Sequence, residues 1–390
     1  MTQEKLPPPT VIDTLPDLES LSEELADVAR VGIDVESDGF YVYHEKVCLL
    51  QLSTVEEDFV IDPLAVQDLS PLGPMFRDPR IEKVFHAAEY DVLCLKRDFG
   101  FHIRNIFDTM AASRTLGVVK LGLANVIEEH FGIRLSKKLQ RANWGKRPLS
   151  REQLEYARLD THYLLDLSAA LLARLEDKGL LKDARDEFER LERLEPNARR
   201  FDPDAFWNLP GARKLSPQAR AVLKELYIGR ERRAAELDRA PFRVLPEELL
   251  VRLAEVSPAS SDALRQFRGM TPYLFTHFQR DILDAVRRGL SAPPIDAPPA
   301  RPANNRWSPM SLRRYEALRR WRKAQAESRG VSPIVVLSTD EIRRLAHAPD
   351  ENPEPAVWLD CLSEYKRGVY GEQLLPILHE KPSGRPRRKK

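Results

Sequence analysis

Two carboxylates stand two residues apart in the segment VGIDVESDGF, at Asp34 and Glu36. The apolar residues Val31, Ile33 and Val35 alternate with them, which is the period of a β-strand with one face in a core. Side chains at i and i+2 of a strand point the same way, so Asp34 and Glu36 repel each other unless water screens their charges or a cation neutralises them. A solvated strand face is the ordinary explanation of a lone Asp-x-Glu, so the choice depends on partners elsewhere in the chain.

Further carboxylates in the chain could supply those partners. Asp91 follows a strand-like start in VFHAAEYDVL, and α/β folds commonly place functional groups just after a strand end. Tyr156 and Asp160 lie four apart in LEYARLDTHYLL, so they share a face of a predicted helix. If Asp34, Glu36, Asp91 and Asp160 converge, their all-oxygen cluster suits Mg²⁺ or Mn²⁺ better than zinc. Two such ions could support phosphodiester hydrolysis, one activating water and the other stabilising the leaving 3′ oxygen.

The elements that must position these residues are predicted from hydrophobic periodicity. Residues 47–54 and 58–63 are expected to add two strands to the first one as a meander. Residues 81–100 and 105–117 each change from a strand pattern to a helix pattern that ends at a glycine. Helices are expected at 121–131 and 150–176, the last one opened by a capping box of Ser150 and Gln153. An α/β domain of about two hundred residues follows from this order.

The rear half of the chain has a different character. From residue 210 onward strand signals almost vanish and Arg-rich amphipathic helix patterns dominate. Residues 226–254 align without gaps onto residues 318–346, at an offset of 92 residues, so two related helical domains are expected. A segment with six prolines lies between them and is typical of an extended linker, and the basic end KPSGRPRRKK is expected to be disordered.

Composition narrows the class of protein. Charged residues make up 31% of the 390 residues, and no apolar run approaches the length of a membrane span. The first residues contain no apolar segment, so we expect no secretory signal and a cytoplasmic protein. The three cysteines are far apart, which indicates neither a zinc site nor a disulfide framework. Residues 1–60 carry 14 acids and 3 bases, whereas residues 301–390 carry 19 bases and 11 acids, which suits a metal site followed by an anion-binding surface.

The motifs DVE, HAAEYD and YARLD resemble the three exonuclease motifs of the DEDD superfamily, in the subtype whose third motif is Y-x-x-x-D. The run LQRANWGKRPLSREQLEYARLD resembles the ribonuclease D family, and the two repeats resemble the HRDC domains of that family. Asn143 stands where many relatives carry Asp, and Ala87 where relatives often have Asn. The resemblance covers nearly the whole chain. It implies an α/β RNase H-like exonuclease domain, a mixed sheet with flanking helices, followed by two all-α HRDC-like domains.

The resemblance also implies roles for the site residues. Asp34, Glu36 and Asp160 would hold a first metal ion, Asp34 would bridge to a second, and Asp91 would hold that ion mainly through water. Tyr156 would orient the attacking water. Because a tyrosine hydroxyl ordinarily has a pKa near 10, Tyr156 is expected to position the water rather than deprotonate it. The cofactors expected are two divalent cations, Mg²⁺ or Mn²⁺.

A basic stretch before the third motif carries an aromatic residue, which suits phosphate contact and base stacking, although a solvated loop explains any one of its members as well. The candidate nucleic-acid-binding residues are Lys137, Lys138, Arg141, Trp144, Lys146 and Arg147. His86 could be a metal ligand or a base, but a histidine at a strand end is more often structural.

The leading hypothesis is a metal-dependent 3′–5′ exoribonuclease that trims RNA with a free 3′ end, such as tRNA precursors, and releases nucleoside 5′-monophosphates. A DNA exonuclease of the repair or proofreading type shares the metal site, and a non-catalytic RNA-binding adaptor is a third reading. No G-x-x-x-x-G-K-[ST] motif occurs, which favours the free-standing ribonuclease. No membrane or protein partner is implied, and a monomer is expected. The predicted domains are 1–200 (exonuclease), 210–291 (first HRDC-like), 292–307 (linker), 308–380 (second HRDC-like) and 381–390 (tail).

Overall fold

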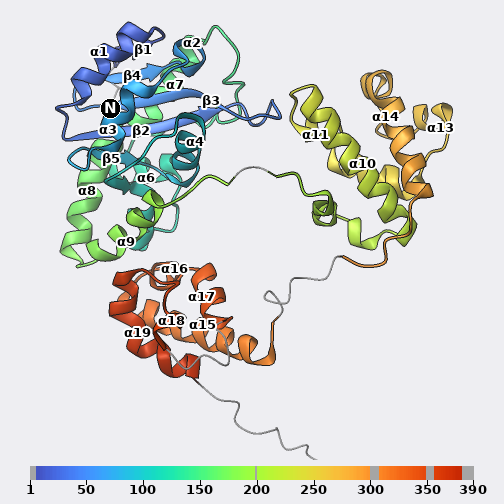
Figure 1. Ribbon diagram of the computed structural model, residues 1–390. Helices are drawn as coiled ribbons and strands as arrows, with labels where there is room; N and C mark the ends of the chain where they lie inside the picture. The colour runs from blue at the N-terminus through green and yellow to red at the C-terminus, as the bar shows by residue number, and fades with distance from the viewer. Residues whose placement is uncertain (1–5, 198–199, 299–306, 348–354, 380–390) are drawn as a thin grey trace, which may run out of the picture.

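The computed structural model describes residues 6–197, 200–298, 307–347 and 355–379. The tail at 381–390 and part of the predicted linker lie outside the described residues. Figure 1 shows three bodies along the chain: an α/β domain, a helical body containing α10 to α14, and a second helical body containing α15 to α19.

A six-stranded mixed sheet forms the centre of the first body, in the order β1-β4-β3-β2-β5-β6. Strands β2, β3 and β4 are antiparallel neighbours, as the predicted meander requires, and β5 and β6 join the other edge of β2 in parallel. β1 pairs in parallel with β4. The strands are β1 (Thr10–Ile12), β2 (Arg30–Ser37), β3 (Val47–Ser53), β4 (Asp58–Ile61), β5 (Glu82–Phe85) and β6 (Ile106–Asp108).

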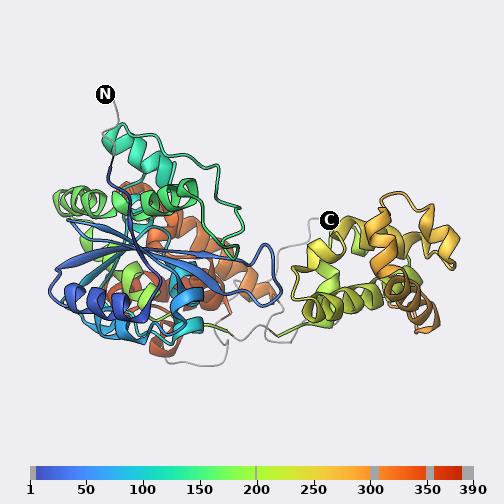
Figure 2. The ribbon, with the colours of Figure 1, turned by 90° about the horizontal axis from the view of Figure 1, so that it is seen from above.

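Helices cover both faces of this sheet (Figure 2). Val31, Ile33 and Val35 of β2 are buried in a core that also contains residues of α1, α3 and α4. The opposite face of β2 lies under α7 and α8, since a Cβ added at Gly32 would meet Thr161 and Leu164. The helices of this body are α1 (Leu15–Leu25), α2 (Pro63–Val66), α3 (Gly73–Arg77), α4 (Glu89–Phe99), α5 (Thr109–Thr115), α6 (Leu123–Phe131), α7 (Arg151–His162), α8 (Leu164–Asp177) and α9 (Leu181–Glu192), with a 3₁₀ turn at Ser70–Leu72.

The helix predicted at 150–176 is two helices, which corrects the sequence-based expectation. α7 ends at His162, and α8 begins at Leu164 after Tyr163 leaves the helical conformation with φ −94° and ψ 1°. The capping box at the start of α7 is present: Gln153 donates its backbone N–H to Ser150 Oγ at 3.2 Å and accepts from Ser150 N at 3.0 Å. The break separates the segment that carries the third motif from the segment that packs in the core.

The two helical bodies repeat each other at an offset of 92 residues, as the sequence alignment predicts. The short helices α11 (Pro241–Val244) and α16 (Pro333–Val336) begin and end at positions that differ by this offset. The first helical body ends with α14 at Ser291, and the second begins with α15 at Pro309. The first helical body contains α10 (Pro217–Glu236), α11, α12 (Glu247–Val256), α13 (Ser261–Arg265) and α14 (Pro272–Ser291), preceded by 3₁₀ turns at Pro203–Asn208 and Ala212–Lys214. The second contains α15 (Pro309–Arg329), α16, α17 (Thr339–Ala346), α18 (Pro355–Trp358) and α19 (Glu364–His379).

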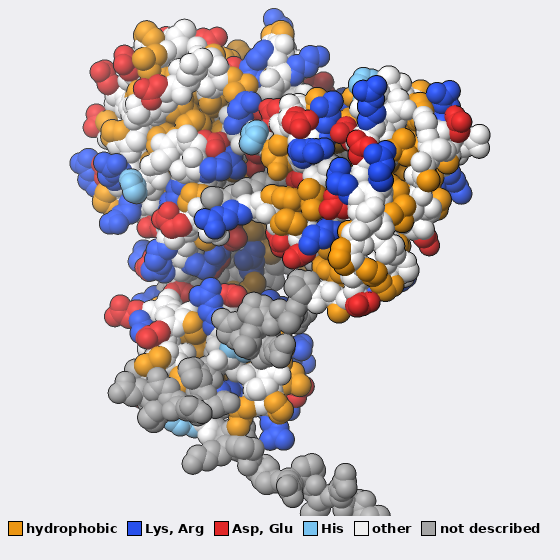
Figure 3. Space-filling view, turned by 45° about the vertical axis from the view of Figure 1, so that its right-hand side comes forward, with side chains coloured by type: hydrophobic (Ala, Val, Ile, Leu, Met, Phe, Trp, Pro, Cys, Tyr) orange, Lys and Arg blue, Asp and Glu red, His pale blue; other side chains and the backbone are white. Residues whose placement is uncertain are grey.

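Each helical body contacts the α/β domain at a different place. The first binds the loop between β2 and β3, where Asp238 Oδ1 accepts from the backbone N–H groups of Tyr43 and His44 at 3.1 and 2.9 Å. The second shares a hydrophobic core with α5, α6, α8 and α9, and Arg329 makes a bidentate ion pair with the buried Asp183 of α9. Figure 3 shows Lys and Arg side chains mixed with Asp and Glu on all three bodies. No helix in the described part of the chain could span a membrane.

Candidate metal centre

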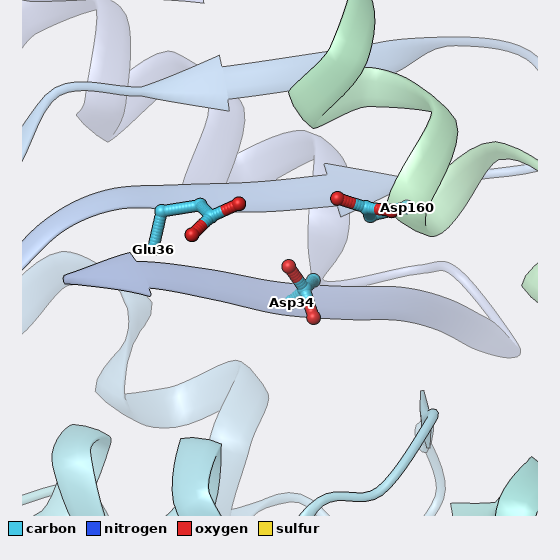
Figure 4. A group of neighbouring side chains, drawn as sticks. All are labelled: Asp34, Glu36 and Asp160. Atoms are coloured by element: carbon cyan, nitrogen blue, oxygen red, sulfur yellow. The ribbon is translucent and has the colours of Figure 1, made fainter. Parts of the chain in front are cut away.

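Strand β2 and helix α7 bring three carboxylates together (Figure 4). Asp34 and Glu36 project from the same face of β2, because they are two residues apart, and Asp160 reaches toward them from α7. One oxygen from each of the three carboxylates lies within 4.8 Å of the others. All three side chains keep part of their exposure to solvent, so an ion can reach them. Three oxygen donors at this spacing fit a hard divalent cation.

A close approach of backbone to backbone sets the position of α7 over β2. A Cβ at Gly32 would lie 3.1 Å from the carbonyl oxygen of Thr161, so glycine lets the helix come down onto the strand. The Ser53 hydroxyl of β3 donates to Asp58 Oδ1 at 2.7 Å, and its oxygen lies 2.6 Å from the hydroxyl oxygen of Thr161. His162 Nδ1 lies 2.8 Å from the other oxygen of Asp58. This network fixes the C-terminal end of α7, which carries Asp160, against β3 and β4.

Asp91 lies in the first turn of α4, close to the three carboxylates but outside the group whose oxygens all lie within 4.8 Å of one another. The side chain is buried. Burial raises its pKa, and the nearby Asp108 and Asp160 carboxylates raise it further. The structure therefore brings together three of the four predicted carboxylates tightly and places the fourth beside them.

The carboxylates are held in conditions that disfavour their charge. Burial, followed by the Asp160 and Asp91 carboxylates, raises the pKa of Glu36 to about 9, and burial raises the pKa of Asp160 to about 7. Asp34 has its pKa raised by burial and by Asp91, Asp160 and Glu36. No basic group in the described part of the chain contributes to these shifts. An arrangement of several acids without a basic partner calls for a cation.

Tyr156 lies one turn before Asp160 on α7, and its ring centre is 6.0 Å from that of Trp144. Burial raises the pKa of the Tyr156 hydroxyl above its usual value, and the Asp160, Glu36 and Asp34 carboxylates add to the shift. The hydroxyl therefore stays protonated at neutral pH. Tyr156 can donate a hydrogen bond at the site but is a poor base.

Two of the residues predicted to bind nucleic acid have structural roles instead. Trp144 is 1% exposed and packs with Cys48, Leu49 and Val60, so its faces are not open to a base. Arg147 holds Asp62 in a bidentate ion pair at 2.5 and 2.7 Å. Its remaining N–H groups donate to the carbonyl oxygens of Trp144, Lys146 and Cys48. Both corrections have one cause, since the loop folds back under Tyr156 and the side chains expected to face RNA anchor it there.

The other predicted RNA-binding residues remain on the surface of the same loop: Lys137, Lys138, Arg141 and Lys146 are exposed. Lys138 pairs with Glu152 at 3.0 Å, where both partners are exposed. The Arg141 guanidinium lies 5.9 Å from the centre of the Phe40 ring, and Phe40 is 51% exposed. An exposed aromatic residue thus lies beside the basic loop, at Phe40 rather than at Trp144.

His86 takes no part in the group of three carboxylates. Its Nδ1 lies 2.9 Å from the hydroxyl of Thr109, and burial lowers its pKa to about 4. The imidazole is therefore neutral at physiological pH, which favours the structural interpretation of this residue.

The chain and its fold match known proteins. A family model described as 3′-5′ exonuclease matches residues 9–176, and the HRDC domain model matches residues 219–286 and 311–378. Ribonuclease D of Gluconacetobacter diazotrophicus is 31% identical over 376 residues, which cover 95% of this chain and 93% of that protein. The chain belongs to the ribonuclease D family. It is accordingly a 3′–5′ exoribonuclease, in a family that is typically divalent-metal dependent.

Solved structures and RRP6 relatives agree with this assignment. Escherichia coli RNase D, described as an exoribonuclease involved in structured RNA processing, matches with a TM-score of 0.67 and 27% identity, over 96% of this chain and 100% of that one. The catalytic core of RRP6 from Trypanosoma brucei matches with a TM-score of 0.67 and 31% identity, over 73% of this chain and 80% of that one. The exosome exonuclease RRP6 of Saccharomyces cerevisiae is 33% identical over 64% of this chain, which spans only 36% of that protein.

Ala87, just before α4, has a strained backbone conformation. Ala87 has φ +66°, in the left-handed region that favours Gly and Asn. We expect Ala87→Gly to raise the free energy of unfolding by about 1 kcal/mol, because the strain removed exceeds the extra flexibility of glycine in the unfolded chain. The neighbouring Ala88, with φ −53°, is the matched control. Ala88→Gly should lower stability in the same chemical denaturation experiment, and a loss of stability in both variants would contradict the strain at Ala87.

The pKa shifts in this ribonuclease D family member predict an unusual pH dependence. In the metal-free protein, Glu36 and Asp160 keep protons up to about pH 9 and about pH 7, whereas the unfolded chain releases them near pH 4. Stability from these groups is therefore present below about pH 4 and lost as the pH rises through the folded-state values. Added Mg²⁺ should raise the melting temperature more at about pH 8 than at about pH 6. Equal increments at the two pH values, measured by calorimetry, would contradict this.

Some functional features were missed from the sequence. Gly32, Asp58 and His162 position α7, but only their tertiary contacts reveal it.

Proposed function

We propose that this chain uses two divalent cations, Mg²⁺ or Mn²⁺, to remove nucleotides from the 3′ ends of structured RNA such as tRNA precursors, releasing nucleoside 5′-monophosphates. The observation that carries the proposal is the group of Asp34, Glu36 and Asp160, whose oxygens lie within 4.8 Å of one another with no basic partner among the residues that the structure describes. The description of E. coli RNase D as an exoribonuclease of structured RNA supports the substrate class.

The carboxylates would bind the cations, and Tyr156 would act on the attacking water. Asp34, Glu36 and Asp160 would hold one cation, and Asp34 and Asp91 would hold the other, with Asp91 acting through water. Bound cations would supply a more acidic water and neutralise charge on the phosphate and the leaving oxygen. Tyr156, kept protonated by its surroundings, would orient the attacking water by hydrogen bonding.

The RNA end would approach along the basic loop. Lys137, Arg141 and Lys146 are exposed and can contact phosphates, while the exposed Phe40 ring beside Arg141 can stack on a base. The first helical body fixes this region, because Arg243 donates a hydrogen bond to the Phe40 carbonyl oxygen at 2.5 Å. Its guanidinium also lies 4.1 Å from the centre of the Tyr41 ring.

Digestion of matched single-stranded RNA and DNA, each labelled at the 5′ end, tests the proposal. With Mg²⁺ or Mn²⁺ the RNA should shorten in single-nucleotide steps, and EDTA should stop the reaction until excess Mg²⁺ is added. Faster loss of the DNA would favour the DNA exonuclease reading. Binding of RNA without any ladder would indicate a non-catalytic adaptor.

Replacement of Tyr156 by Phe should lower kcat by about tenfold, because the carboxylates remain and only the alignment of the water suffers. Single-turnover rates at saturating Mn²⁺ measure the effect apart from RNA binding. A Phe variant as fast as the wild type would exclude a positioning role for the hydroxyl.

A further inference from the structure

A buried amide lies in the sheet beside the metal centre. Gln51 of β3 is the cross-strand partner of Asp34 on one side and of Val60 on the other. Residues directly opposite each other in antiparallel strands share a face, with Cβ atoms about 5 Å apart. Gln51 therefore projects on the face of the sheet that carries the carboxylate of Asp34. It is 0% exposed.

Helix α7 covers the same face around Gln51. Its same-face neighbours on β3 are Leu49, which packs with Ala157, and Ser53, which hydrogen bonds to Thr161. The segment of α7 between those contacts carries Asp160. Gln51 is thus enclosed between the strand that holds Asp34 and the helix that holds Asp160.

The amide has no hydrogen-bond partner within the part of the chain that the structure describes. Neither Nε2 nor Oε1 of Gln51 is bonded. A buried amide without partners is destabilising, and a leucine or methionine of similar volume could fill this position on a wholly buried strand. A polar group in such a place needs a charge or a ligand to interact with.

We propose that Gln51 is a positioning residue for the metal centre, donating a hydrogen bond from Nε2 to the Asp34 carboxylate when that carboxylate is ionised and holds a divalent cation. The inference rests on the proposed function. Carboxylates that bind metals are commonly oriented by a second hydrogen bond, and the loss of such a partner weakens metal binding about 10- to 100-fold. The bond also reduces the cost of burying the amide, since Nε2 gains an acceptor in the metal-loaded state.

Metal binding and stability, measured together, test the proposal. Gln51→Leu and Gln51→Met remove the amide at nearly constant volume, and Leu49→Met is the matched control on the same face of the same strand. Mn²⁺ affinity is measured by isothermal titration calorimetry, and the melting temperature is measured with and without Mn²⁺. We expect both Gln51 variants to bind Mn²⁺ about tenfold more weakly while their metal-free melting temperature is unchanged or higher. The control should bind Mn²⁺ like the wild type.

Several results would overturn the proposal. Mn²⁺ affinity within about twofold of the wild type in both variants would mean that the amide serves packing or holds a structural water. The same conclusion follows if neither variant unfolds cooperatively, or if Leu49→Met weakens Mn²⁺ binding as much. A wild-type chain that binds no Mn²⁺ would overturn the metal site itself, which separates failure of the proposed function from failure of this inference.

Discussion

Replacement of Asp34 or Asp160 by asparagine should reduce RNA hydrolysis by at least about 1,000-fold, because each change removes a charged donor from a site that works as a unit. The two residues come from different elements, β2 and α7, yet their oxygens lie within 4.8 Å of each other. Asparagine keeps the shape of the side chain and removes one negative charge. We therefore expect the metal-free variants to be at least as stable as the wild type, since they relieve the burial of a carboxylate and the repulsion by its neighbours, which together raise the pKa of Asp34.

Because activity should fall while stability is kept, a loss of hydrolysis cannot be explained by unfolding of the variant. Activity is measured as the single-turnover rate on 5′-labelled RNA, RNA binding by filter retention, and stability by thermal unfolding. The matched control is Asp166→Asn, which removes an exposed carboxylate from the first turn of the neighbouring helix α8. Hydrolysis within about tenfold of the wild type in Asp34→Asn would exclude the metal assignment.

The part of the site that follows local periodicity could be predicted from the sequence. Asp34 and Glu36 share a face because a strand has a period of two, and Tyr156 and Asp160 share a face because a helix has a period near four. The convergence of β2 with α7 could not be derived from either pattern. It depends on Gly32, whose missing Cβ admits Thr161, and on the pairing of His162 with Asp58 across 104 residues of sequence.

The errors have the same origin. The segment 150–176 has no Pro or Gly to end a helix, so the break at Tyr163 has no local signal, and it arises where α7 and α8 both descend onto β2. Trp144 and Arg147 have the residue types of an RNA-binding loop, and only the contacts with Tyr156 and Asp62 assign them to packing. Residue type limits what a side chain can do, whereas burial determines which of those functions is available.

The contacts of the second helical body determine how its role must be tested. Removing it would expose the core it shares with α8 and α9 and would leave Asp183, now paired with Arg329, without a partner. Asp186 would likewise lose Lys366, which lies 3.6 Å away. A deletion would therefore mix loss of RNA binding with destabilisation of the α/β domain.

Substitution of exposed arginines on this body avoids that difficulty. The side chains of Arg313, Arg319, Arg320 and Arg343 are exposed, and within the described residues none of them forms an ion pair. Changing all four to glutamine should weaken binding of tRNA by about 10- to 100-fold at low salt, because phosphate contacts release counterions. The slope of log affinity against log salt should become shallower by up to about 3, whereas the rate on short single-stranded RNA should not change.

A control variant changes two exposed arginines on the face of the α/β domain opposite α7. It tests whether tRNA affinity depends on the position of the arginines or only on the total charge of the protein. Arg77 follows the buried Phe76 of α3, on the face of the sheet opposite α7, and Arg104 donates its backbone N–H to the Phe76 carbonyl oxygen. Glutamine at both positions should leave tRNA affinity and its salt slope nearly unchanged. Parallel salt plots for the wild type and the fourfold variant would mean that the second helical body serves assembly of the fold, through Arg329 and Lys366, and does not capture RNA.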